Sequence, residues 1–515
     1  MFEALTAHWD LALFFVALSS VIIIYFTNNP LKHTRRFMWR RFVNWFPLGM
    51  TYAFLYMARY NLAVSKNALG TMMTKEDFGI IFAAGTTTYA LSFFLNGPLV
   101  DKMGGKKGIV IAALGASIMN GLMGLATYLY LNDHMSMNLT LVFSLLYALN
   151  MYFQSFGAVS IIKVKAYWFH VRERGIFGAI FGTLISFGAY FAFDWGGSIA
   201  NAAKLTMTEA PTAAQKFIRL IFAVDTGTSD AYWLIFLIPA VILVFWALMN
   251  MIFLKDSPDQ AGFDEFDPHD ASSDEPDAPA LTMPQLIRKI VTNPIMLTIG
   301  LVEFCSGVLR NGIMQWYLVF AKEVPQLGAE FFKERWGILL AVSGMLGGFA
   351  AGYISDKIFH SRRGPPAAIL SGVMTGLTVI MAIFLLKSPV IVGICATLMI
   401  FAVIGVHSIM SGTAAADFGG RKNTATASGL VDAAVYFGSS VQSLSIGYLT
   451  TIDWKYWPMF LVPFAILGAL GAIKMWAAIP EATRRYLMRI EQVTIVTASG
   501  TKIESTRKTV SISES

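Results

Sequence analysis

Thirteen long apolar runs divide this 515-residue chain, and few folds can accommodate so many. A transmembrane helix needs about 20 predominantly apolar residues, so the runs have the length of thirteen membrane crossings. They centre on residues 11–27, 43–65, 79–100, 108–131, 139–162, 176–194, 233–254, 294–320, 334–355, 367–387, 390–412, 426–449 and 457–478. Hydrophobic residues make up 56% of the chain and charged residues 14%, whereas soluble domains carry roughly 45–50% and about 25%. The sequence therefore predicts a polytopic all-α membrane protein and excludes a soluble enzyme, a disordered chain and a single-span receptor.

Basic residues gather in alternate loops between the apolar runs. These loops are Lys32 to Arg41, Lys102 to Lys107, Lys163 to Arg174, Lys357 to Arg363, Arg421 with Lys422, and Arg484 to Arg489. The positive-inside rule places this set in the cytoplasm, and with it the C-terminus. The first run has a basic cluster only after it, the reverse of a signal sequence, so the N-terminus is expected outside. The net charge of +7 thus reflects topology rather than nucleic-acid binding.

The runs fall into two sets of six behind one extra helix. Nine acidic residues and several prolines lie between Asp256 and Asp277, and such a segment cannot bury enough apolar surface to fold alone. We therefore predict an added N-terminal transmembrane helix, a first bundle, an acidic cytoplasmic linker, a second bundle and a cytoplasmic tail. Their ranges are 1–29, 30–254, 255–292, 293–480 and 481–515. A re-entrant or interfacial segment is the alternative for the first range.

A short motif occurs at the same place in both bundles. GPLVDKMGGKK contains Gly97, Asp101 and Lys102, and GYISDKIFHSRR contains Gly352, Asp356 and Lys357. Glycine permits close helix approach, and a carboxylate at a cytoplasmic helix end can pair with cationic loop residues. The repeated motif resembles the loop signature of the major facilitator superfamily. That resemblance implies two pseudo-symmetric six-helix bundles around a central substrate site, and for the motif a cytoplasmic latch.

Further segments resemble one family within that superfamily, the organophosphate:phosphate antiporters. YMARYN around Arg59 is similar to the family's first-helix arginine motif, with Tyr52 and Tyr56 before it. YFQSFG, AYWFHVRERG, LRNG around Arg310 and ASGLVDAAVYFGSS around Tyr436 resemble other family patterns. The match spans roughly residues 40–480. Phe93, Ile185 and Ala341 depart from it, standing where family members often carry lysine, histidine and glutamate.

Two arginines stand at near-equivalent positions of the two bundles. Arg59 and Arg310 precede the two loop motifs by similar distances, so pseudo-symmetry is expected to bring both to the centre. An arginine at mid-membrane costs about 2.5–3.5 kcal/mol on insertion scales and needs a compensating anion. A phosphate monoester supplies that charge and suits the planar guanidinium fork. The residues alone also allow each arginine to pair permanently with an acid such as Glu303 or Asp432.

Other polar residues in the apolar runs are weaker candidates. Tyr52, Tyr56, Tyr89 and Tyr436 are expected to hydrogen-bond substrate, with packing as the alternative, whereas Tyr448 is expected at the membrane interface. Asp432 could partner Arg310, select a cationic substrate group or carry a proton. His407 and Glu303 could serve coupling or gating, or be a satisfied core histidine and interhelical glue.

The combined expectation is a secondary antiporter that exchanges inorganic phosphate for a phosphorylated three- to six-carbon metabolite across a bacterial-type inner membrane. We expect no catalytic residue, cofactor or metal, and a monomer in the bilayer. Cys305 and Cys395, the only cysteines, lie in apolar runs and form no metal motif. Two rivals stay open, a transporter-like sugar-phosphate sensor and a proton-coupled carrier of organic anions.

Overall fold

The computed structural model describes residues 9–27, 29–134, 138–170, 173–204, 213–222, 230–264, 284–285, 287–288, 292–324, 329–359, 362–418 and 420–477. Throughout these residues the regular structure is helical. The first helices are α2 (Trp9–Thr27), α3 (Arg35–Leu69), α4 (Lys75–Met103), α5 (Gly105–Leu131), α6 (Leu139–Trp168), α7 (Arg174–Tyr190), α8 (Gly196–Ala202), α9 (Ala213–Phe222) and α10 (Leu234–Phe253). The remaining helices are α12 (Pro294–Met314), α13 (Trp316–Glu323), α14 (Glu330–Glu334), α15 (Trp336–Tyr353), α16 (Gly364–Phe384), α17 (Pro389–Phe418), α18 (Gly420–Ile452) and α19 (Tyr456–Lys474).

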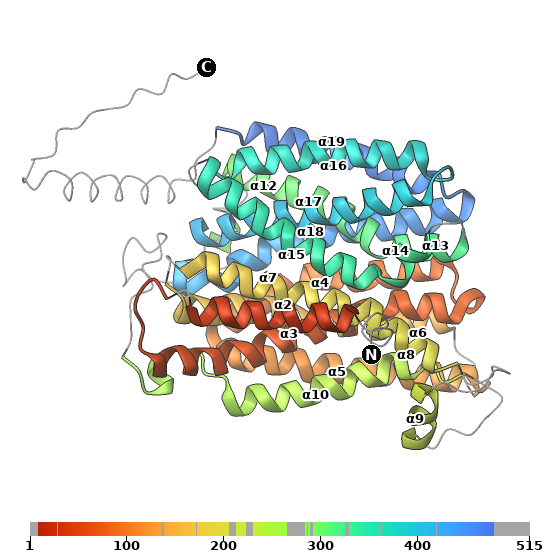
Figure 1. Cartoon of the computed structure of the whole chain (residues 1–515), viewed down its shortest axis with the longest axis horizontal. Helices are drawn as coiled ribbons and strands as arrows, with labels where there is room; N and C mark the ends of the chain where they lie inside the picture. The colour runs from red at the N-terminus through yellow and green to blue at the C-terminus, as the bar shows by residue number, and fades with distance from the viewer. Residues whose placement is uncertain are drawn as a thin grey trace, which may run out of the picture.

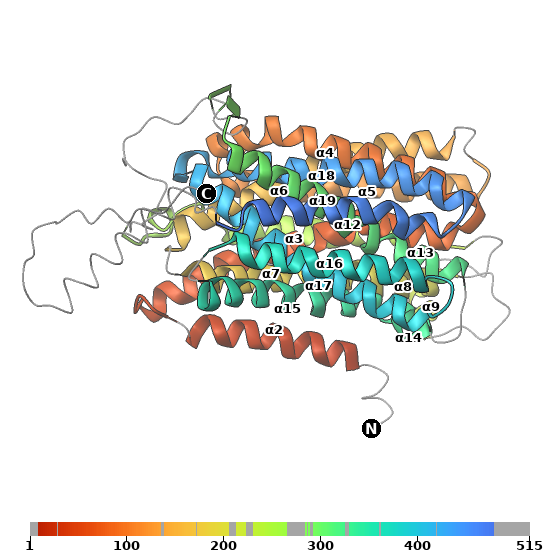
Figure 2. The same cartoon turned by 90° about the horizontal axis from the view of Figure 1, so that it is seen from above.

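Each of the thirteen predicted apolar runs coincides with a helix, and the all-helical fold is confirmed. Figure 1 shows the helices lying side by side, with α3, α5 and α10 on one side and α12, α16, α17 and α19 on the other. We call α3–α10 the N-terminal bundle and α12–α19 the C-terminal bundle. The two meet mainly where α4 packs on α18 and α7 on α15, and Figure 2 shows the same arrangement from above. The domain boundaries stay a prediction, although α10 ends at Phe253 and α12 begins at Pro294.

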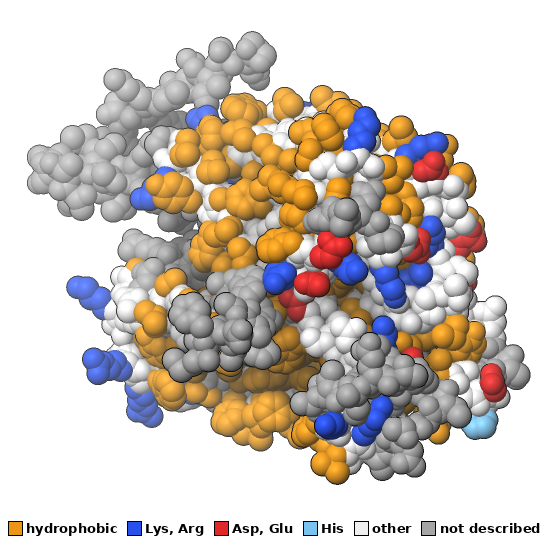
Figure 3. Space-filling view, turned by 45° about the vertical axis from the view of Figure 1, so that its right-hand side comes forward, with side chains coloured by type: hydrophobic (Ala, Val, Ile, Leu, Met, Phe, Trp, Pro, Cys, Tyr) orange, Lys and Arg blue, Asp and Glu red, His pale blue; other side chains and the backbone are white. Residues whose placement is uncertain are grey.

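Hydropathy alone recognises only part of this bundle. Nine helices in the described part of the chain are long and apolar enough to cross a membrane, and α3 and α18 are not among them. Both are long enough, with 35 and 33 residues, but polar and charged side chains interrupt their apolar stretches. Figure 3 shows hydrophobic side chains over the flank and charged ones gathered at the end turned toward the viewer. Polar residues in α3 and α18 therefore face the interior, as the buried state of Arg59 and Ser439 shows.

The added helix α2 packs along α7. The ring of Phe14 lies 4.6 Å from that of Phe187 and 5.5 Å from that of Phe191. The opposite face of α2 carries Phe15 and Val16, which are more than half exposed, as expected for side chains toward lipid. We therefore describe α2 as a peripheral helix of the bundle.

A buried ion pair fastens α2 and α3 to the junction between α6 and α7. The guanidinium of Arg41 donates two 2.8 Å hydrogen bonds to the Glu173 carboxylate, and both side chains are at most 1% exposed. Arg41 also donates to the Tyr25 hydroxyl of α2 at 3.1 Å and to the Trp168 carbonyl at 3.2 Å. Hydrogen bonds from His33, Arg41 and the His170 backbone outweigh burial and lower the pKa of Glu173 to about 2.

Replacing Glu173 tests this anchor. Glu173→Gln leaves the Arg41 guanidinium buried without its partner, a change that typically costs about 3–5 kcal/mol. We expect a clearly lower Tm in detergent, whereas Glu334→Gln at an exposed site should leave it unchanged. Because the pKa of Glu173 is depressed, its contribution is complete above its ordinary value of 4.5 and is lost as the pH falls toward about 2. Equal Tm values for both variants would contradict this account.

The first residues of the predicted acidic linker are folded. The Asp256 carboxylate accepts a 2.7 Å hydrogen bond from the Lys106 amide at the start of α5. Phe263 packs edge-on against Phe37 of α3 at 5.4 Å. The region 255–264 therefore belongs to the bundle surface, while most of the linker and the tail from 481 onward lie outside the described residues.

Candidate functional site

Arg59 lies fully buried in the C-terminal half of α3. Its Nε donates a 3.0 Å hydrogen bond to the Gln154 Oε1 of α6. Its Nη1 donates to the hydroxyl of Tyr436, which α18 contributes from the C-terminal bundle. Its Nη2 is buried and has no hydrogen-bond partner among the described residues. Arg59 therefore joins the two bundles and keeps one donor group for a further acceptor.

Aromatic rings enclose the Arg59 guanidinium. Its carbon lies 4.9 Å from the ring centre of Tyr56, 4.6 Å from that of Tyr89 and 5.4 Å from that of Tyr436. The Tyr89 and Tyr436 rings are themselves 4.0 Å apart. The attraction between a desolvated cation and the faces of such rings contributes about 2 kcal/mol or more. The rings thus stabilise an arginine for which the described residues supply no carboxylate partner.

A chain of amides holds Gln154 toward Arg59. Asn150 accepts a 3.1 Å hydrogen bond from the Gln154 Nε2 and donates one to the Ala58 carbonyl. Asn120 donates to the same carbonyl at 3.2 Å. Because the acceptor side of Asn150 fixes the Gln154 amide, the oxygen of Gln154 is directed at the guanidinium. The α3–α5–α6 core is therefore built to orient Arg59.

Arg310 is buried in α12, with 5% of its surface exposed. Its guanidinium carbon lies 5.9 Å from the ring centre of Tyr436, so Tyr436 contacts both arginines. Its Nε is buried without a hydrogen-bond partner among the described residues. Two cations from opposite bundles thus converge on one tyrosine, and both retain unpaired donors.

The acids of the C-terminal bundle do not neutralise these arginines by direct contact. Glu303 is fully buried and binds His407 of α17, with 2.9 Å between its Oε2 and the His407 Nδ1. Asp432 accepts a 3.4 Å hydrogen bond from the Ser411 hydroxyl. Within the described residues, neither arginine forms an ion pair within 4.0 Å of a carboxylate. The described residues therefore do not show the permanent arginine–carboxylate ion pairs that were the alternative.

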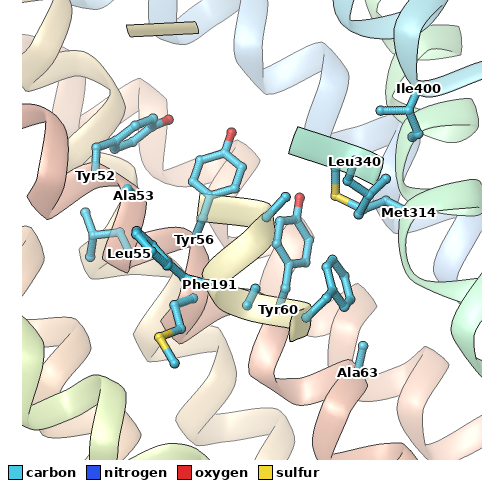
Figure 4. Close-up of a cluster of buried hydrophobic side chains, with 14 of the residues drawn as sticks. Tyr52, Ala53, Leu55, Tyr56, Tyr60, Ala63, Phe191, Met314, Leu340 and Ile400 are labelled. Atoms are coloured by element: carbon cyan, nitrogen blue, oxygen red, sulfur yellow. The ribbon is translucent and has the colours of Figure 1, made fainter. Parts of the chain in front are cut away.

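The predicted tyrosines differ in how they reach the site. Tyr52, Tyr56 and Tyr60 project from one side of α3, as Figure 4 shows. Tyr56 contacts Arg59 directly, whereas the ring of Tyr52 packs on that of Tyr56 at 5.3 Å. Tyr448 is 53% exposed and lies away from the arginines, as expected for an interface residue.

Gln154 and Tyr60 are neighbours of the site that sequence reasoning did not single out. The Tyr60 hydroxyl donates a 3.2 Å hydrogen bond to the Asn311 Oδ1, which joins α3 to α12 beside Arg310. Asn311 in turn donates to the Ser439 hydroxyl at 2.6 Å. The available signal was the presence of amide side chains, Gln154 in α6 and Asn311 in α12, within apolar helices, since such groups are buried only with partners.

The two loop motifs differ in structure. In the first, Asp101 pairs with Lys163 of α6 at 2.9 Å, which fastens α4 to α6 within the N-terminal bundle. Its neighbour Lys102 is exposed, and Gly97 is buried. The second copy forms a π-helical turn, Ile354–Ile358, where Lys357 is exposed. The side chain of Asp356 lies outside the described residues.

Gly352, the glycine of the second loop motif, does not serve to bring two helices close together. A Cβ atom built on Gly352 would meet nothing within 4 Å. The close contact lies on another face of α15, where a Cβ at Gly347 would clash with the Phe401 carbonyl oxygen. The expectation that Gly352 permits close packing is therefore wrong, because this position points away from neighbouring helices.

Ion pairs join the bundles at the end opposite the basic loops. Lys66 at the end of α3 and Lys75 at the start of α4 lie 3.6 and 3.0 Å from the Glu323 carboxylate of α13. Lys75 also donates a 2.8 Å hydrogen bond to the Thr450 carbonyl of α18. A Cβ at Gly79 of α4 would lie 2.6 Å from the Ser443 carbonyl, so the helices touch there. The bundles are closed against each other at this end.

A helix-end contact adds to this closure. Asp194 lies in the π-helical turn Phe191–Trp195 that follows α7. Its two carboxylate oxygens accept hydrogen bonds of 2.8 and 2.9 Å from the Gly337 and Ile338 amides of α15. A carboxylate at a helix N-terminus satisfies free amides and interacts favourably with the helix dipole. Asp194 is therefore a second cross-bundle contact on the closed side.

The chain is similar in sequence to one large family of membrane proteins and to several of its members. The model of the Major Facilitator Superfamily matches residues 42–443. The "Membrane sensor protein UhpC" of Salmonella typhimurium is 24% identical over 87% of this chain and 94% of its own. A "Probable hexose phosphate transport protein" of Chlamydia pneumoniae is 22% identical with the same coverages, and the "Glycerol-3-phosphate transporter" of Bacillus subtilis is 22% identical over 82% and 90%.

Solved structures confirm the predicted fold class. An inward-facing, unoccupied bacterial homologue of the human lysosomal transporter Spinster superposes with a TM-score of 0.59. It shares 15% identity, with 88% of this chain and 99% of that chain covered. The transporter FucP in its outward conformation gives a TM-score of 0.55 at 15% identity, covering 83% and 97%. The chain is a multi-pass membrane protein rather than an enzyme, and it belongs to the Major Facilitator Superfamily as a relative of hexose phosphate and glycerol 3-phosphate transporters.

Proposed function

We propose that the chain is a secondary antiporter that exchanges inorganic phosphate for an organophosphate such as glycerol 3-phosphate or a hexose phosphate. The observation that carries this proposal is the convergence of buried Arg59 and Arg310, from opposite bundles, on Tyr436. Two relatives of the chain, a probable hexose phosphate transport protein and a glycerol-3-phosphate transporter, support the same substrate class.

Phosphate suits this pair of side chains. Near neutral pH a phosphate monoester carries close to two negative charges and several acceptor oxygens. The free Nη2 of Arg59 and the free Nε of Arg310 are donors that such oxygens can accept from. The remaining wall is aromatic and can accommodate an organic group without a second charge. We propose Arg59, Arg310, Tyr56, Tyr89 and Tyr436 as direct contacts, with Tyr52 behind Tyr56.

The two cations also explain why exchange would be obligatory. Interconversion of the two access states removes the water that screens the guanidinium groups from each other. A bound dianion neutralises them, so the loaded protein can change state while the empty one resists. Inorganic phosphate carries the same head group as the organic substrate. It can therefore complete the return half of the cycle.

The decisive test is counterflow in proteoliposomes. Vesicles loaded with phosphate should take up labelled glycerol 3-phosphate or glucose 6-phosphate, and vesicles without internal phosphate should take up little. Equal uptake by loaded and empty vesicles would contradict obligatory exchange. Control vesicles without protein set the background.

The sensor alternative is favoured by one observation, the similarity to the membrane sensor protein of Salmonella typhimurium. The added helix α2 and the acidic segment after α10 offer surfaces for a signalling partner. A sensor should bind an organophosphate, seen as a rise in Tm, without counterflow. Binding together with counterflow would exclude the sensor as the sole function.

We further propose a monomer in the bacterial inner membrane, with the basic end in the cytoplasm and the start of α2 outside. The positive-inside rule supports this orientation. Labelling of a cysteine at Lys32 from outside intact cells would contradict it.

A further inference from the structure

Three helices of the C-terminal bundle bring acids and a histidine together beside the arginine site. Glu303 lies on α12, His407 and Ser411 on α17, and Asp432 on α18, and these helices pack on one another. Glu303 precedes Arg310 by two helical turns, and Asp432 precedes Tyr436 by one, so each lies on the face of its helix that carries a site residue. We call Glu303, His407 and Asp432 the acid–histidine cluster.

Only one of the two carboxylate oxygens of Glu303 has a hydrogen-bond partner among the described residues. Its side chain is fully buried, and its Oε2 is bound to the His407 Nδ1 at 2.9 Å. Its Oε1 is also buried and has no hydrogen-bond partner among the described residues. A buried carboxylate needs a positive or donating partner, because an uncompensated charge in an apolar interior is costly. His407 is the residue in contact that can supply one.

We propose that the acid–histidine cluster binds a proton that accompanies phosphate, a role that rests on the proposed phosphate site. A neutral imidazole that donates from Nδ1 to Glu303 keeps its Nε2 as an acceptor. A proton on Nε2 converts the hydrogen bond into an ion pair without moving a heavy atom. His407 keeps 25% of its side chain exposed, whereas Glu303 is fully buried, so His407 is the member of the pair through which the proton is proposed to enter and leave.

Charge counting gives the direction of coupling. Glu303 and Asp432 lie near the site but form no ion pair with either arginine, so they add negative charge beside the phosphate position without neutralising the two guanidinium groups there. A phosphate dianion then adds two negative charges, and a proton on His407 offsets one of them. Phosphate binding and proton binding therefore favour each other, and linkage makes the effect reciprocal.

The surroundings contain few competing groups. Along α19 the only ionisable side chains are Tyr456 and Lys474 at its two ends, and α16 has none. On α15 the only one is Tyr353, which is 65% exposed. On α17 and α18 the other ionisable residues are Cys395, Asp417, Arg421, Lys422, Tyr436 and Tyr448. Asp417, Arg421 and Lys422 stand at helix ends, with side chains outside the described residues. Among the described side chains of these helices, His407 is the one whose ordinary protonation equilibrium lies nearest to neutral pH.

Calorimetry measures the proton directly. Binding of inorganic phosphate to the purified full-length protein is recorded in two buffers of different ionisation enthalpy, which gives the protons taken up per phosphate. The comparison includes wild type, His407→Gln and Glu303→Gln. The controls are His134→Gln and Glu334→Gln, which change exposed residues of the same types.

We expect wild type and both controls to take up more protons per phosphate than either cluster variant. We also expect phosphate affinity, corrected for the titration of phosphate, to fall by up to about tenfold per pH unit above the imidazole midpoint. The cluster variants should lose this dependence while still binding phosphate. Equal proton counts in all five proteins would overturn the proton site and leave the phosphate site standing.

If a variant does not fold, the proton count measured on the wild type alone still tests the proposed proton site. Inorganic phosphate in solution is a mixture of the monoanion and the dianion. When the protein binds only the dianion, the remaining monoanion releases protons to the buffer, whereas protonation of His407 takes one proton up. Release at the level expected for phosphate alone would overturn the inference. Failure of wild type to bind phosphate, an organophosphate or both would instead overturn the proposed function on which it rests.

Discussion

Arg59→Lys and Arg310→Lys should each lose phosphate exchange by on the order of a hundredfold. Lysine keeps the charge but lacks the planar fork, so two charge-assisted hydrogen bonds to phosphate are lost or misdirected. At about 1.5 kcal/mol or more for each bond, the loss is about 3 kcal/mol, or two factors of ten. At Arg59 the substitution also removes the hydrogen bonds to Gln154 and Tyr436 that set the side chain's direction.

The measurement is the initial rate of counterflow at equal protein content. Arg335→Lys provides a matched control, because this arginine is partly exposed and lies just before α15, at the closed end. It should retain the wild-type rate. A fully active Arg59→Lys or Arg310→Lys protein would remove the proposed mechanism, since charge alone would then be sufficient.

A disulfide between the bundles should abolish exchange. The hydroxyl oxygens of Thr87 on α4 and Ser440 on α18 lie 2.5 Å apart, so cysteines at both positions are within reach of a disulfide. In a background with Cys305 and Cys395 replaced, Thr87→Cys with Ser440→Cys should cross-link on oxidation. The link holds α4 against α18, whereas alternating access requires the two bundles to move relative to each other at this interface. We expect residual exchange of a few per cent at most and recovery on reduction.

Each single-cysteine protein serves as a control and should be insensitive to the same oxidant. The extent of cross-linking is read from the change in electrophoretic mobility. If the fully cross-linked protein exchanged phosphate at the uncrosslinked rate, the bundles would not need to move relative to each other at α4 and α18. The rocking model would then be wrong for this chain.

Much of the fold could be predicted because apolar runs have a fixed length requirement in a bilayer. The run at 294–320 illustrates the limit of this reasoning, since the helix is interrupted at Gln315 between α12 and α13. The segment between α7 and α10 also contains two short helices that were not predicted. In α9, Leu220 and Phe217 are strongly exposed, and α9 projects from the bundle in Figure 1. Its ten residues are too few for a membrane-spanning run.

The site could be predicted in part, because buried arginines in apolar helices are unusual and demand a partner. Tyr436 was a candidate by position, and the structure places it against both arginines. The partner of Glu303 could not be assigned, since His407 lies 104 residues away and only the packing of α12 against α17 unites them. The Lys75–Glu323 pair could not be predicted for the same reason.

The most direct test of the central claim is a cryo-EM structure of the protein with glycerol 3-phosphate. Our account predicts density for the phosphoryl group within hydrogen-bonding distance of both the Arg59 and the Arg310 guanidinium groups, beside Tyr436. Phosphoryl density at another place, or at one arginine while the other binds a carboxylate, would contradict it.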